Sequence, residues 1–119
     1  MIKKKFKWSS LSPASKKRAK QNREYSVKRK AFLQAHPYCQ WWLRMRSIPE
    51  ERAMEFGAPP SNDIHHMASR IGKLLTDERY FMAVSRAGHL WIHQHPKESE
   101  SLGFIIRLRT DGTNPNDPQ

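Results

Sequence analysis

Apolar residues in this chain fall into a few short runs, and the spacing within each run indicates a helix or a strand. Residues 21–35 contain few helix-breaking residues and place four apolar side chains at intervals that give a helix one apolar side. Those four are Tyr25, Val27, Phe32 and Leu33. Pro37 disfavours the helical conformation at His36. We therefore predict a helix over residues 21–35.

Two strands are predicted in the middle of the chain. The stretch GAPPSN, residues 57–62, is rich in turn-forming residues and indicates a loop. NDIHHM, residues 62–67, has the character of a short strand. RYFMAVS, residues 79–85, predicts a second strand, with a loop through Gly72 between the two.

The segment after the second strand has helical character. AGHLWIHQH, residues 87–95, predicts a helix that Pro96 closes, and a further short helical piece is expected up to Gly103. The polar, turn-forming stretch RTDGTNPNDPQ ends the chain. We expect an α+β fold with one domain over residues 21–105 and a disordered polar tail over residues 106–119.

Length and composition limit the class of protein. At 119 residues the chain can form one domain with a modest core. It contains no run of about 18 apolar residues that could span a membrane, and its charged opening, MIKKKFKWSS, is not followed by the apolar stretch of a secretory signal. The single cysteine, Cys39, excludes an internal disulfide framework and suits a reducing compartment. We expect a cytoplasmic protein.

The positive charge is concentrated at the start of the chain. Residues 1–30 contain twelve Lys or Arg and one acidic residue, Glu24, so they carry the whole net charge of +11. We expect residues 1–20 to form a flexible basic arm that binds polyphosphate or is simply solvated. The arm lacks the long apolar face with which a helix lies on a membrane. Nucleic acid is therefore the favoured partner.

Five of the six histidines lie between residues 63 and 96. His89 and His93 are four residues apart, so on a helix they share one face and can bind a single ion. His65 and His66 are adjacent, so on a strand they point to opposite sides. Three imidazoles leave open positions on a divalent ion, and the fourth can accept a proton from an attacking water. The pattern favours metal-assisted phosphodiester hydrolysis; a solvated helix face or a structural site has the same spacing.

These motifs resemble the HNH endonuclease family of the ββα-metal fold, in particular its small phage and prophage members. DIHH is similar to the first motif of the family, which implies that His65 binds the metal and that His66 is the general base. GHLWIH is similar to the final motif, which implies that His89 and His93 complete the metal site. The resemblance covers roughly residues 22–105.

Two features depart from the family pattern. Tyr80 stands where the family has the Asn that pins the loop carrying the base, so we expect that loop to be held in another way. Many relatives bind a structural zinc through two Cys-x2-Cys pairs. In this chain the four corresponding positions are Cys39, Trp42, Ser85 and Gly88. With one thiol of four, no structural zinc is expected, and we hypothesise that Trp41 and Trp42 fill the space instead.

The resemblance implies an enzyme that hydrolyses phosphodiester bonds of DNA with low sequence specificity, using one divalent ion (Mg²⁺, Mn²⁺, Ni²⁺ or Zn²⁺). It also implies phage DNA processing or packaging in the host cytoplasm, phage packaging proteins as further partners, and a monomer or weak dimer. Cations in the arm and between the motifs are positioned to contact phosphates, unless they are simply solvated. The candidate DNA-binding residues are Lys16, Lys17, Arg18, Lys20, Arg70, Lys73 and Arg79.

Three functions stay open from the sequence. The first is an active endonuclease, in which Asp63 or a nearby carbonyl orients His66. The second is a catalytically weak or inactive nucleic-acid-binding module. The third is a small metal-binding protein whose histidines support the fold and which acts through a protein partner.

Overall fold

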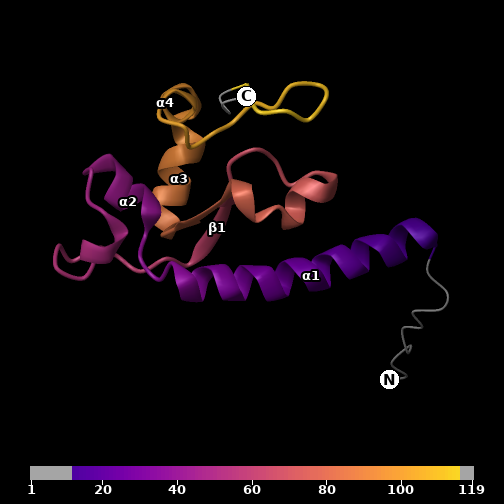
Figure 1. Ribbon diagram of the computed structural model, residues 1–119, viewed down its shortest axis with the longest axis horizontal. Coiled ribbons are helices and arrows are strands. Elements are labelled where there is room, and N and C mark those ends of the chain that lie inside the picture. Colours follow the sequence, from indigo (N-terminus) through magenta and orange to yellow (C-terminus); the bar gives the residue numbers. More distant parts are fainter. Residues whose placement is uncertain (1–11, 116–119) are drawn as a thin grey trace, which may run out of the picture.

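A long helix, α1 (Pro13–Ala35), runs along one side of the molecule (Figure 1). It belongs to a computed structural model that describes residues 12–115. Ser12 caps the helix, because its side-chain oxygen accepts a hydrogen bond from the Ser15 amide at 3.2 Å. Pro13 suits the first helical position. The last residue of α1 is the one predicted from the sequence.

The start of α1 corrects one expectation. Composition predicts a flexible arm over residues 1–20 and a helix from Gln21, but residues 13–20 are helical. The stretch PASKKRAK consists mainly of alanine, lysine and arginine, which have high helix propensity, and the Ser-Pro pair before it is a helix start signal. Residues 12–18 are exposed, so a solvated basic segment is present, but it is ordered as helix. Residues 1–11 of the expected arm lie outside the described residues.

Strands β1 (Asp63–His66) and β2 (Phe81–Val84) form an antiparallel hairpin, and both predicted strands are confirmed. His65 pairs with Met82, and the next residue of β1 pairs with Phe81. All four residues of β2 are buried, which is expected for a strand that other elements cover on both faces.

Helix α3 (Arg86–Gln94) follows β2 directly and confirms the third predicted element. Ser85 alone separates the two and caps the helix, because its hydroxyl oxygen accepts a hydrogen bond from the Gly88 amide at 3.1 Å. A short helix, α4 (Pro96–Ser101), comes next, as the sequence indicated. The chain therefore combines helices with a two-stranded sheet, in agreement with the α+β class.

The two faces of the hairpin are covered by different helices (Figure 1). Helix α3 packs on one face, and the buried side chains in the core on this side include Met82, Val84, Ile92 and Phe104. On the other face, the rings of Tyr25 and Phe32 from α1 pack edge-on against Phe81, with centroid distances of 6.0 and 5.5 Å. Because side chains alternate along a strand, His65 faces α3 and His66 faces α1.

Helix α2 (Gln40–Met45) has no counterpart among the predicted elements, because six residues are too few to show a helical repeat. The side chain of Gln40 fixes it to the sheet. Its oxygen accepts a hydrogen bond from the Ala83 amide at 2.7 Å, and its nitrogen donates one to Glu50 at 2.6 Å. A second small core next to α2 contains Leu43, Ala53 and Ala58.

Among residues 12–115, three short 3₁₀ helices complete the fold: η2 (Glu50–Arg52), η3 (Gly72–Thr76) and η4 (Glu78–Tyr80). The last two form the connection between β1 and β2, and η3 lies against α1. Within residues 12–115, no helix combines the length and the apolar character needed to cross a bilayer.

The segment after α4 corrects a second expectation. Composition predicts a disordered tail from residue 106, but the Ile106 amide donates a hydrogen bond to the Met67 carbonyl at 2.8 Å. The packed unit therefore extends past the predicted boundary at residue 105. Three apolar side chains there pack against the core: Ile105, Ile106 and Leu108. The sequence did not indicate this packing, because the apolar stretch is short and the polar residues that follow it are typical of a disordered tail. Residues 116–119 lie outside the described residues.

Candidate metal centre and nucleic-acid interface

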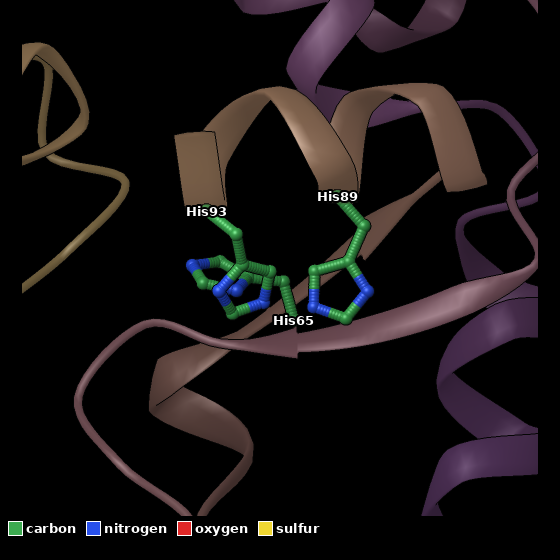
Figure 2. Close-up of side chains that lie close together, drawn as sticks. All are labelled: His65, His89 and His93. Carbon is green, nitrogen blue, oxygen red and sulfur yellow. The ribbon is translucent and has the colours of Figure 1, made fainter. Parts of the chain in front are cut away.

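His65, His89 and His93 meet between β1 and α3 (Figure 2). One nitrogen from each ring can be chosen so that the three lie within 4.8 Å of one another. The ring centroids of His89 and His93 are 4.6 Å apart, and that of His65 is 5.4 and 5.9 Å from them. The clustering predicted from the sequence is therefore present, and the three residues could bind a metal ion.

The local structure explains why these rings meet. The histidines of α3 are one helical turn apart on the face that lies against the hairpin. The cap at Ser85 starts α3 immediately after β2, so the helix position is fixed relative to the strand that pairs with β1. His65 then points from β1 into the same space, because alternation along the strand turns it toward α3.

His65 is buried and neutral. The residue is 4 % exposed, and its Nε2 lies 2.7 Å from the Phe104 carbonyl oxygen. A carbonyl can only accept, so Nε2 carries the proton and Nδ1 keeps a lone pair. Burial lowers the pKa of His65 to about 4, against the raising effect of the Phe104 hydrogen bond and with support from the nearby His89 and His93. At neutral pH this imidazole can therefore act as a ligand.

Asp63 orients His89. Its Oδ2 lies 3.4 Å from His89 Nδ1, a long contact for a hydrogen bond, and this leaves Nε2 for an ion. A carboxylate behind a ligand histidine is common in metal sites. This arrangement corrects the suggestion that Asp63 orients His66. The sequence contained an indication of this contact. Asp63 and His65 are two residues apart on a strand, so both side chains lie on the face that is turned toward α3.

The donor set fits a metal ion. Three imidazole ligands suit Zn²⁺ or Ni²⁺, whereas Mg²⁺ and Mn²⁺ prefer oxygen ligands. His65 is buried, while His93 lies on the exposed side of the cluster. One side of the cluster is thus open to solvent.

His66 lies on the other face of the hairpin, under α1. Its Nε2 is 3.1 Å from the Leu75 carbonyl oxygen, so Nε2 donates and Nδ1 can accept a proton. This nearby carbonyl is the second of the two orienting groups predicted from the sequence. Burial lowers the pKa of His66, the hydrogen bond opposes this, and the charges of Arg70 and His89 add to the lowering. The residue is 9 % exposed, and its ring packs against Tyr25 and Phe81.

Tyr80 does not hold the loop through its hydroxyl. Its side chain is buried in the core and makes no hydrogen bond with residues 12–115. The loop is held from α1 instead, because Lys28 Nζ donates a hydrogen bond to the Thr76 carbonyl at 3.0 Å. Lys28 was not among the predicted site residues.

Three of the four positions that would carry zinc ligands by the HNH resemblance, Cys39, Ser85 and Gly88, are close together, and tryptophan packing occupies the region. Both the amide and the hydroxyl of Ser85 donate to Cys39 Sγ, at 3.2 and 3.3 Å. A Cβ atom on Gly88 would lie 2.9 Å from a ring carbon of Trp41. Trp41 and Trp42 both pack against the core, as hypothesised.

The predicted DNA-binding cations divide into three groups. Lys17, Arg18 and Arg70 line one groove between α1 and η3. Arg79 forms a bidentate ion pair with Asp77, at 3.0 and 2.7 Å, which offsets its charge and weakens its candidacy as a phosphate ligand. The remaining three are exposed and do not line the groove: Lys16, Lys20 and Lys73.

Comparison with known proteins gives no further identification. No family model, no curated protein and no solved structure matches this chain. Its function therefore has to be inferred from the geometry described above.

Proposed function

We propose that the protein is a metal-dependent endonuclease of the HNH type that hydrolyses phosphodiester bonds in DNA. The observation that carries the proposal is the convergence of His65 with His89 and His93, across a hairpin and the helix that follows it. The adjacent His66 is held in a proton-accepting tautomer. This combination agrees with the roles that the HNH resemblance implies.

Each proposed role follows from the state of the side chain. His65, His89 and His93 would hold one divalent ion. A bound ion would act as a Lewis acid and stabilise the charge that develops on the phosphate. His66 accepts the proton of the attacking water at Nδ1, and the Leu75 carbonyl fixes its tautomer. The lowered pKa of His66 favours the unprotonated ring that this role needs.

Nicking of supercoiled plasmid tests the proposal. The protein is incubated with Ni²⁺, Zn²⁺, Mn²⁺ or Mg²⁺, beside His66→Ala and the control His95→Ala. His95 stacks on Trp91 and lies outside the cluster, so its loss should leave nicking intact. Nicking that needs metal and His66 supports the proposal. Nicking that survives in His66→Ala, or that occurs equally in chelator, contradicts it.

A second candidate is a nucleic-acid-binding module without catalysis. The covering of His66 by α1 favours it, because a base must reach a water and this ring is nearly buried. Plasmid that is retarded in a gel but not cut with any of the metals would support this function and exclude the first.

A further inference from the structure

A basic groove lies between α1 and the loop that carries η3. Its volume is about 580 Å³. Its lining includes three cations, Lys17, Arg18 and Arg70, and two amide side chains, Gln21 and Asn22, but no acidic residue. None of the three cations has an ion pair with a carboxylate of residues 12–115. Such a surface is suited to a ligand with several negative charges.

The groove is connected to the proposed base. Leu75 lines the groove, and its carbonyl oxygen accepts the hydrogen bond from His66. The Arg70 guanidinium lies 5.7 Å from the centre of the Tyr25 ring, which covers His66. A chain of phosphates in the groove would therefore pass beside His66.

The size of the groove limits the form of the ligand. A volume of this order is typical of sites that enclose one small molecule, about 300–1,000 Å³. A duplex, whose major groove alone is about 12 Å wide, is too broad to enter such a space. One or two nucleotides of a single strand fit, with phosphates on the cations and base edges near the amides of Gln21 and Asn22. Ile71, which is 82 % exposed, offers an apolar surface at the groove for a base.

We propose that this groove binds a short single-stranded segment of DNA next to the phosphate that is cut. The inference rests on the proposed nuclease function, which supplies DNA as the ligand. It adds that the substrate is unpaired at this point, as in a single strand or a frayed junction, and that Lys17, Arg18 and Arg70 contact its phosphates.

Two double variants of α1 test the groove with equal loss of charge. Lys17→Gln/Arg18→Gln removes two groove cations, whereas Lys16→Gln/Lys20→Gln removes two cations of the same helix that do not line the groove. All four positions are exposed, and glutamine is a good helix former, so both variants should fold. Circular dichroism checks that their helix content is equal.

Binding is measured in chelator, by fluorescence anisotropy, with labelled oligothymidylate of about 12 nucleotides and with a duplex of equal length. We expect Lys17→Gln/Arg18→Gln to lose about tenfold in affinity for the single strand at low salt, because two phosphate contacts are lost. The slope of log affinity against log salt should fall by about 1.4. The control variant, whose two cations do not line the groove, should lose less affinity for the single strand than the groove variant.

Equal losses of single-strand affinity in the two double variants would contradict binding in the groove, since the effect of a cation would then not depend on its position. A preference of the wild type for the duplex would also overturn it. Because no metal is present, the result stands even if the protein cuts nothing. Conversely, metal-dependent cleavage could be weakened equally by both double variants. This result would leave the nuclease proposal intact and would contradict the groove as the binding site.

Discussion

The ring of Tyr25 lies over the ring of His66, with centroids 5.2 Å apart. This contact connects α1 to the proposed base and contributes to the burial that lowers the pKa of His66. We predict that Tyr25→Ala raises this pKa toward its ordinary value, because burial is the largest cause of the shift. NMR titration of the His66 ring protons measures the change. Tyr25→Phe keeps the ring and should leave the pKa in place; a pKa unaltered in Tyr25→Ala would contradict the prediction.

Acid should destabilise the metal-free protein through His65. The folded pKa of about 4 lies below the ordinary 6.5, so between these values the unfolded chain binds a proton that the folded chain does not. Above pH 6.5 the contribution of His65 to the free energy of unfolding is fully present. It is lost as the pH decreases toward 4, by roughly 3 kcal/mol at most. Urea unfolding in chelator at several pH values measures this slope. In His65→Gln the slope should be smaller, and an equal slope there would assign the effect to other groups.

Metal binding should depend on His93 and not on His95. We expect Ni²⁺ or Zn²⁺ to raise the melting temperature of the wild type and of His95→Ala, and chelator to reverse the shift. Metal at about 100 times its dissociation constant adds about 2.7 kcal/mol to the free energy of unfolding. Truncation of His93 removes one of three ligands and should abolish most of the shift. An undiminished shift in His93→Ala would place the ion elsewhere.

Gly88→Ala should destabilise the protein, although alanine is the better helix former. The added Cβ would lie 2.9 Å from the Trp41 ring and 3.2 Å from Cys39 Sγ. Overpacking of this kind costs about 1–3 kcal/mol, which exceeds the propensity gain of about 1 kcal/mol. Urea unfolding measures the loss. The double variant with Trp41→Leu should recover part of it, whereas a more stable Gly88→Ala would show that the space is open.

Lys28→Met should loosen the loop that carries Leu75. The substitution keeps the apolar stem but removes the hydrogen bond to the Thr76 carbonyl, at a cost of about 1–2 kcal/mol. Amide exchange in η3 should accelerate, and nicking should slow because the carbonyl that orients His66 is in this loop. Lys30→Met, at an exposed position of the same helix, is the matched control. Exchange that accelerates equally in both variants would contradict a specific role for Lys28.

The sequence predicted the hairpin, α3 and the histidine cluster because their periodicities are local. Alternation along β1 places His65 and Asp63 on one face of the hairpin. The four-residue spacing on α3 places His89 and His93 on one face of that helix, which packs against the hairpin. The remaining contacts depend on tertiary packing. The carbonyl of Phe104, 39 positions from its partner in the chain, could not be paired with His65 from spacing.

The extent of α1 could not be derived from composition. Lysine-rich segments are typical of disordered arms, and helix propensity is a weak signal without an apolar face. The helix forms where a cap starts it and where Tyr25 and Phe32 anchor its second half on the hairpin. The placement of the helix over His66 therefore follows from packing that the sequence pattern did not specify.

The direct junction of β2 and α3 makes the candidate metal centre sensitive to changes in chain length. A single residue inserted beside Ser85 would turn α3 by about 100° and move His89 and His93 away from His65. The connection between the strands should tolerate length changes better, because the entropic cost of closing a loop rises slowly with its length and residues 70–73 are exposed. An insertion near Ser85 should therefore abolish metal binding, whereas an insertion near Ile71 should leave the three histidines together.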